Sequence, residues 1–354
     1  MKSATSAAEV RDQLAELSAS AWTYTAIGAA VELGLPASMV EPTSAVSLAS
    51  AAGVSVPLAS SLAEALVAGG LAERKGAGFV AASGLGALAA GPSQEVLRAD
   101  LRSGLLQMAA LFDGATRAQV GTGWRHADER ILQAQGVMSA GAIAMLEAQV
   151  FPHMEGMKER LDSVDGAFLD VGAGVAAVSI ELCLRHPRLR AVALEPQEPP
   201  RRLAQLNVAN AGLSDRIEIR AGLVEDLKDR EAFALVWLPG NFLGSEAMPK
   251  ALAAVHRALR PGGYLLNACL GGGGDDQRST AARLRAVLWG GDTVAPEHIA
   301  DLLRQAGFDG VALMDRLPSG LVPMQARRRP HMGAGQRSSG GSGQTATRTH
   351  EPTD

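Results

Sequence analysis

Between residues 166 and 328, short apolar runs alternate with stretches of helical spacing, and this alternation constrains the fold more than any other feature. Strands that alternate with helices of this length favour crossover connections, which make the strands parallel within one sheet. Residues 167–171 form the first such run and residues 190–194 the next. The segment therefore predicts an α/β domain built on a parallel sheet.

A glycine turn follows the first predicted strand. Asp170, Gly172, Ala173 and Gly174 lie between that strand and a stretch of helical spacing. Glycines at such a turn let the backbone approach a ligand closely, and the helix N-terminus offers the ligand amide hydrogens. Glu195 ends the second predicted strand, about 20 residues further on, where an acid can accept hydrogen bonds from both ribose hydroxyls of an adenosine. The set predicts a site for an adenosine cofactor.

Two cofactors fit this turn. Gly172, Gly174 and Ala177 satisfy the dinucleotide spacing, which tolerates Ala at its third position, so a nicotinamide-dependent oxidoreductase is one alternative. Asp170 favours the other cofactor, because an acid two residues before the first glycine repels a pyrophosphate. The same acid suits the cationic amino and sulfonium groups of S-adenosyl-L-methionine. We therefore expect S-adenosyl-L-methionine as the cofactor.

The order of motifs over residues 166–270 resembles the core of class I S-adenosylmethionine-dependent methyltransferases. Residues 169–174 resemble the first motif and Glu195 the second, and residues 207–217, 234–239 and 259–265 resemble the segments around the third, fourth and fifth strands. The resemblance implies a Rossmann-like fold with a mainly parallel seven-stranded sheet. It implies methyl transfer to a small-molecule acceptor, in secondary metabolism. It also implies cofactor contacts from Asp170, Gly172, Ala173, Gly174, Glu195, Leu223, Val224 and Leu238.

The sequence departs from that family at three places. Ala176 replaces the third glycine of the first motif, a change that the loop should tolerate. After the third strand, many relatives have an Asp that contacts the adenine, whereas this chain offers Leu223 and Val224 for apolar and backbone contacts. Residues 237–244 hold no histidine, although O-methyltransferases of this type often place a base there. A protein that keeps the fold for ligand binding or regulation is therefore an alternative to an active enzyme.

Replacements for the missing base lie in the linker, residues 93–163, which in such folds lines the substrate pocket. We place His153 first, followed by His126 and Asp113, although His153 could also be a helix-start residue without a chemical role. Asn241 could orient a substrate through its amide or simply form a turn. We expect His256 on a solvated helix face. Apolar side chains that could line a pocket or simply pack the helices are Met108, Phe112, Trp124, Met138, Met145 and Met154.

The N-terminal region, residues 10–90, predicts short helices followed by a β-wing. Residues 47–66 have a helix-turn-helix pattern, but no Lys or Arg occurs between Arg11 and Arg74. Glu64 is the only charged residue in the second helix of that pattern, whereas a DNA-binding helix needs cationic side chains that face the phosphates. We therefore expect no nucleic-acid partner. The region resembles the winged-helix dimerisation domain of bacterial and plant small-molecule O-methyltransferases, which implies a homodimer.

Composition predicts the remaining properties. Cys183 and Cys269 are too few for a disulfide framework and lack metal-ligand spacing to a histidine, so we expect a cytoplasmic protein without a metal. The uncharged run 42–63 contains six serines and two prolines, which excludes a membrane span. We expect a dimerisation domain over 1–92, linker helices over 93–163 and a cofactor domain over 164–328. The Arg-, Ser- and Gly-rich tail, 329–354, should be disordered.

Overall fold

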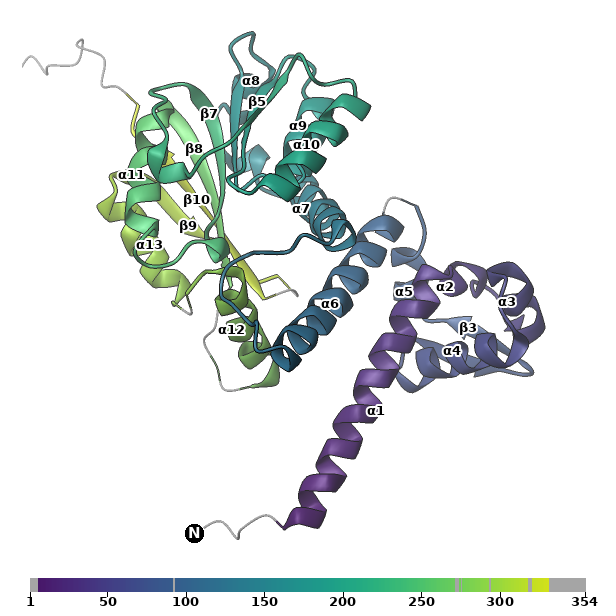
Figure 1. The fold of residues 1–354 in the computed structure, drawn as a ribbon. Helices are drawn as coiled ribbons and strands as arrows, with labels where there is room; N and C mark the ends of the chain where they lie inside the picture. The colour runs from purple at the N-terminus through teal and green to yellow at the C-terminus, as the bar shows by residue number, and fades with distance from the viewer. Residues whose placement is uncertain are drawn as a thin grey trace, which may run out of the picture.

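The structure is a computed structural model that describes residues 6–91, 93–270, 274, 276–292, 294–317 and 320–330. Its C-terminal half is built on a seven-stranded sheet with the strand order β6-β5-β4-β7-β8-β10-β9 (Figure 1). The strands are β4 (Ala167–Val171), β5 (Arg190–Leu194), β6 (Ile217–Arg220), β7 (Phe233–Pro239), β8 (Leu259–Leu270), β9 (Phe308–Leu313) and β10 (Leu321–Arg328).

The first five of these strands are parallel, and the last two are not. β4 pairs in parallel with β5 and β7, and the parallel pairing continues to β6 on one side and β8 on the other. β10 runs antiparallel to both β8 and β9. The predicted mainly parallel seven-stranded sheet is confirmed. Its strand order reverses direction between β4 and β7, where parallel sheets place their ligands.

Helices cover both faces of the sheet. One face packs against α9 (Ala177–Arg185) and α10 (Glu198–Asn210), and the other packs against α11 (Met248–Ala258) and α13 (Pro296–Gln305). Leu182 of α9 and Leu252 of α11 are both fully buried, one on each side. Two short 3-10 turns, η2 (Val224–Asp226) and η3 (Gly240–Phe242), follow β6 and β7, and α12 (Gln277–Trp289) follows β8. This three-layer arrangement leaves the carboxyl ends of the parallel strands as the edge available for a site.

The N-terminal region is a winged helix preceded by one long helix. The 26-residue α1 (Ala7–Glu32) is longer than the short helices that the sequence predicted for residues 10–90, and it starts with a reciprocal cap between Ser6 and Glu9. The winged helix comprises α2 (Leu35–Ser38), β1 (Thr43–Ser44), α3 (Ala45–Ala52), α4 (Val56–Ala68), β2 (Ala72–Lys75), β3 (Gly78–Ala81) and α5 (Ser83–Leu88). Within the described chain, α1 extends well beyond this domain at its N-terminal end (Figure 1).

The linker consists of α6 (Ser93–Thr116), α7 (Glu129–Gln149), η1 (Phe151–His153) and α8 (Met157–Asp162). Arg102 of α6 donates two hydrogen bonds, 2.7 and 2.8 Å long, to the carboxylate of Glu32, which ties α6 to α1. α7 packs against α6 and against α9, so the linker joins the two domains. We keep the division at residues 92 and 163 as a proposal.

The structure also bears on the predictions for His256, the two cysteines, a membrane span and the tail. His256 is half-buried and packs edge-on against Phe308, with ring centroids 5.0 Å apart, so its predicted solvated face is wrong. Both cysteines are buried and unpaired. Among the described residues no single helix is long and apolar enough to cross a membrane; only α3 and α4 together pass that test, and they are bent by 107°. Apart from residues 329 and 330, the predicted tail lies outside the described residues.

Candidate functional site

The glycine turn between β4 and α9 lies at the point where the strand order reverses. Gly172 and Gly174 have φ angles of +64° and +56°, a backbone conformation that a β-carbon disfavours. The amide of Ala173 donates to the Leu194 carbonyl at 3.1 Å, and the amide of Gly174 donates to Glu195 Oε2 at 2.9 Å. The turn is therefore fastened directly to the end of β5.

Glu195 lies at that end and is nearly buried, with 6% of its surface exposed. One carboxylate oxygen accepts from Gly174, and the other accepts from the backbone amide of Gln197 at 2.9 Å. Burial raises the pKa of Glu195 despite these two donors. Each oxygen keeps a lone pair, so the carboxylate can still accept hydrogen bonds from two vicinal hydroxyls.

Asp170 lies beneath the turn and is 1% exposed. Its Oδ2 accepts a 2.8 Å hydrogen bond from the Ser179 hydroxyl on α9. The pKa of Asp170 is raised to about 7, mainly by burial; the hydrogen bonds from Ser179 oppose this rise and the charge of Glu195 adds to it. Two buried carboxylates thus share one small region, and Asp170 exposes almost no oxygen surface for a direct hydrogen bond to a ligand.

The three predicted apolar contacts occupy different positions. Leu223 follows β6 and leaves 49% of its surface exposed, so it can cover a ligand at this edge. Val224 is 3% exposed and Leu238 is fully buried, and both side chains pack in the core beside α11. The placement of Leu238 and Val224 therefore gives their side chains a packing role, and of the three only the Leu223 side chain is exposed enough to contact a ligand.

The turn suits a cationic cofactor better than a dinucleotide. A pyrophosphate needs the free amides of a glycine turn, but the Gly174 amide already donates to a carboxylate. The buried charges of Asp170 and Glu195 would repel phosphates and would attract an ammonium or sulfonium group. Among the residues that the structure describes, no group of three or more His, Cys, Asp or Glu side chains could hold a metal ion.

The carboxyl end of β7 forms the other half of the edge. Asn241 is 7% exposed in η3, and Phe242 beside it stacks on Trp289, with centroids 5.3 Å apart and an interplanar angle of 13°. Trp124, from the connection between α6 and α7, meets Phe242 edge-on at 5.4 Å and Trp289 edge-on at 5.9 Å. Three rings from distant segments therefore form an aromatic wall beside η3.

The predicted bases are spread over the molecule. His153 is exposed in η1, and Glu155 close to it pairs at 2.6 Å with Arg327, which also donates to Gly262 at the start of β8. This is the amino edge of the sheet, opposite the glycine turn, so the placement of His153 does not support a part in the chemistry. Asp113 is exposed on α6 and pairs with Arg117. Only His126 lies at the aromatic wall, 4.7 Å from Trp124 between ring centroids.

Several residues of this edge were not predicted from the sequence. Ser179 is the hydrogen-bond partner of Asp170, and its place on the first turns of the helix after the glycines was the available signal. Gln197, two residues beyond Glu195, donates through Nε2 to the Trp124 carbonyl. Trp289 lies more than a hundred residues from Trp124, and nothing local in the sequence connects the two.

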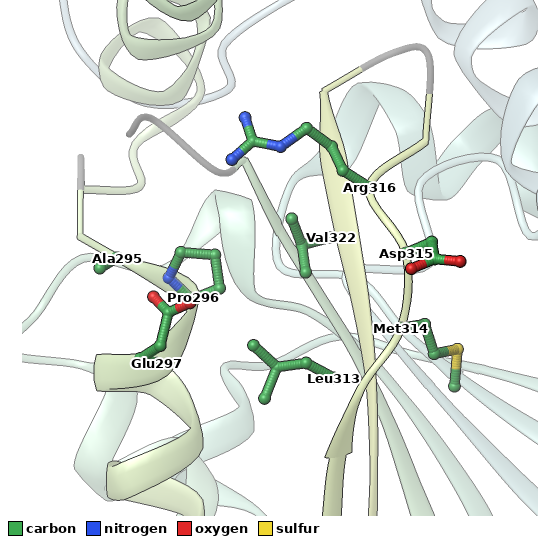
Figure 2. Close-up of a pocket in the computed structure, with 8 residues that line it drawn as sticks. All are labelled: Ala295, Pro296, Glu297, Leu313, Met314, Asp315, Arg316 and Val322. Atoms are coloured by element: carbon green, nitrogen blue, oxygen red, sulfur yellow. The ribbon is translucent and has the colours of Figure 1, made fainter. Parts of the chain in front are cut away.

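Two cavities lie elsewhere. One has a volume of about 320 Å³. Figure 2 shows Pro296, Leu313 and Val322 of its lining grouped below Arg316. It lies beside β9 and β10, and β7 and β8 separate it from β4. The other, of about 400 Å³, lies near Arg160 and Arg260 at the amino edge. Neither cavity adjoins the glycine turn, so we assign the cofactor to neither.

Residues 159–276, about a third of the chain, match the precorrin methyltransferase domain family. This match covers the glycine turn, Glu195 and η3 with Phe242. No curated protein sequence matches the chain significantly.

Solved structures extend the likeness to nearly the whole chain. A Nostoc punctiforme protein assigned as an O-methyltransferase has a TM-score of 0.62 at 18% identity, over 92% of this chain and all of its own. Mitomycin 7-O-methyltransferase has a TM-score of 0.57 at 20% identity, over 91% and 98%. Human N-acetylserotonin methyltransferase, solved with S-adenosylmethionine, has a TM-score of 0.58 at 16% identity, over 93% and 100%. The chain thus has a class I methyltransferase fold with a helical N-terminal domain, as predicted.

Proposed function

We propose that the protein is an S-adenosylmethionine-dependent methyltransferase that acts on a small-molecule acceptor in secondary metabolism. The observation that carries this proposal is the pair of buried carboxylates, Asp170 and Glu195, at the glycine turn. Glu195 has two free lone pairs for a ribose, and the combined charge favours a cationic cofactor. The neighbours of similar fold, two of which were solved with S-adenosylmethionine or its demethylated product, support the same choice.

In this proposal, different residues bind the cofactor and the acceptor. When bound, S-adenosylmethionine supplies a methyl group that its sulfonium has already activated. Glu195, Gly174 and Leu223 would hold the adenosine, and Asp170 would complement the positive charge. The aromatic wall would orient the acceptor, and orientation can supply on the order of 7–11 kcal/mol of the barrier at its upper end. His126, which burial keeps neutral by lowering its pKa, would accept the acceptor's proton.

Calorimetry tests the cofactor assignment directly. We expect S-adenosylmethionine and its demethylated product to bind and NAD not to bind. Binding of NAD alone would overturn the proposal in favour of an oxidoreductase. A broad panel of phenols, amines and keto acids, assayed with labelled methyl donor, then tests activity. Tight cofactor binding together with no labelled product from any acceptor would favour the alternative of a non-catalytic ligand-binding or regulatory protein.

We also propose that the protein forms a homodimer through α1. Apolar side chains recur along one face of this helix at intervals of three or four residues: Val10, Leu14, Leu17, Ala21 and Tyr24. Leu14 and Leu17 are 60% and 57% exposed, and the buried residues of α1 occur only from Gly28 onwards. An apolar stripe of this length on an extended helix is suited to packing against the same stripe of a second copy.

Light scattering tests the dimer. Lysine at both Leu14 and Leu17 should convert a dimer into a monomer, because it places charge in the middle of the stripe. Ala19 lies on the opposite face of α1 and is exposed, so Ala19→Lys is the matched control and should leave the dimer intact. A wild-type protein that is already monomeric at high concentration would contradict the proposal.

We propose a cytoplasmic location, because Cys183 and Cys269 are buried and unpaired. Burial raises their pKa values to about 11 and about 12, so both thiols stay protonated and unreactive. That the N-terminal domain binds no nucleic acid stays a prediction.

A further inference from the structure

Trp124 takes part in two packed groups of side chains at once. On one side it packs against the buried group formed by Leu132 of α7, Val175 after the glycine turn and Leu203 of α10. On the other side it packs with Phe242 and Trp289 of the aromatic wall. We call the region of the glycine turn and Glu195 the cofactor half of the carboxyl edge, and the region of the aromatic wall the acceptor half. The Trp124 ring therefore lies between the two halves.

The backbone of Trp124 is tied to the cofactor half as well. Gln197 donates through its side-chain amide to the Trp124 carbonyl. The backbone amide of the same Gln197 donates to Glu195 Oε1 at 2.9 Å. One residue thus connects the carboxylate that would hold the ribose with the backbone that carries the ring.

The segment around Trp124 is also in contact with the acceptor half, through Gly123. A β-carbon on Gly290 would lie 2.9 Å from the Gly123 α-carbon and 3.6 Å from the Phe242 carbonyl oxygen, so these three backbones are in close contact. Trp289 Nε1 donates to Gln107 Oε1 at 2.7 Å, which fixes the wall to α6. Trp124 and Phe242 are partly exposed, whereas Trp289 is buried.

We infer that Trp124 is a positioning residue that couples cofactor occupancy to the aromatic wall and thereby sets the selectivity of the enzyme for flat, unsaturated acceptors. The inference rests on the proposed function, because it takes the glycine turn as the cofactor site. A ribose bound to Glu195 would hydrogen-bond to the same carboxylate that accepts from the Gln197 backbone amide. Because Gln197 also donates to the Trp124 carbonyl, ribose binding would alter the position of Trp124. The partly exposed residues Trp124 and Phe242 would then offer the acceptor aromatic contacts that favour other aromatic rings.

Tryptophan fluorescence tests the coupling without any acceptor. The demethylated product of the cofactor is titrated into wild type, Trp124→Phe, Gln197→Leu and Trp22→Phe, and calorimetry on the same samples gives the dissociation constant. We expect a ligand-induced change in emission that Trp124→Phe largely removes and Gln197→Leu clearly reduces. Both variants should keep the dissociation constant within about threefold. Trp22 is 74% exposed on α1, so Trp22→Phe is the control and should keep the change.

Binding of matched probes tests the selectivity. 1-Naphthol and its saturated counterpart, decahydro-1-naphthol, are titrated into the protein saturated with the demethylated cofactor. We expect wild type to prefer the flat probe and Trp124→Leu to lose about three- to tenfold of that preference. Trp124→Phe restores an aromatic ring and should recover most of it, which a merely structural loss would not.

The possible failures are distinct. If the demethylated cofactor does not bind wild type, the proposed function fails. If it binds but the emission change survives in Trp124→Phe, the coupling is wrong. If Trp124→Leu keeps the full preference for 1-naphthol, the selectivity role is wrong.

Discussion

The two halves of the carboxyl edge differ in how they are held together. The cofactor half consists of polar contacts between backbone amides and two buried carboxylates, and every partner lies between residues 170 and 197. The acceptor half consists of aromatic rings from residues 124, 242 and 289, joined by edge-on and stacked contacts. A constant ligand with fixed charges requires the first kind of site. A variable acceptor is better served by the second, because rings can be exchanged without loss of buried hydrogen bonds.

The sharpest test of this contrast is Glu195→Gln. The new side-chain amide keeps one acceptor oxygen but turns an N–H group toward the amide of either Gly174 or Gln197, so the variant loses one of the two acceptors and the charge. We expect affinity for S-adenosylmethionine to fall about 100-fold, as calorimetry can measure. Glu198 is exposed on the next helix, and Glu198→Gln should change nothing. Equal affinity in both variants would remove Glu195 from the cofactor site.

His126→Ala tests whether chemistry depends on the acceptor half. We expect kcat to fall about 100-fold with an acceptor found in the panel, while the affinity for S-adenosylmethionine is unchanged. Burial lowers the pKa of His126 below its ordinary value of 6.5. The wild-type rate should therefore fall only as the pH drops through that lowered pKa, and the variant should lack this limb. His153→Ala is the control; an unaltered pH profile in His126→Ala would exclude the base.

Asp170→Asn separates charge from shape in the cofactor half. The pKa of Asp170 is about 7 in the folded protein and 3.8 ordinarily, so the folded state binds the proton more tightly. Stability should therefore decrease as the pH rises from about 4 to about 7, and then level off. The variant should lack this slope and be more stable than wild type at pH 8 by about 1–3 kcal/mol in urea unfolding.

The same variant should bind S-adenosylmethionine about 10-fold more weakly at pH 8, because the complementary charge is gone. Ser179→Ala keeps the charge but removes the hydrogen bond, and should therefore retain the dependence of stability on pH. A pH slope that survives in Asp170→Asn would assign it to another group.

Ala176→Gly should have the smallest effect. Ala176 has a φ angle of +61°, which costs an alanine about 1–2 kcal/mol. The glycine would relieve that strain but would lose a fully buried methyl group and gain freedom in the unfolded chain. These contributions nearly cancel, so we expect a change in the free energy of unfolding within about 1 kcal/mol. Ala177→Gly, one residue into α9, lacks the relief and should only destabilise.

The contrast between the halves also explains what could be predicted from the sequence. The sheet and the cofactor half follow from local patterns, since Asp170, Gly174 and Glu195 belong to two adjacent strands. The acceptor half could not be predicted, because Trp124 and Trp289 meet only after α6, α7 and α12 have packed. The position of His153 could not be predicted for the same reason, because α7 carries the chain from the carboxyl edge to the amino edge before it. Nor did the pattern distinguish the single long α1 from several short helices.

The antiparallel direction of β10 has a practical consequence for anyone who labels or immobilises this protein. Its first residues pair with the end of β8 at the carboxyl edge, and its last pair near the start of β8. Arg328 therefore emerges on the side opposite the glycine turn. A dye, an affinity handle or a surface attachment introduced at residue 329 or 330 would leave the approach to the site unobstructed, whereas one near Leu321 would stand beside it.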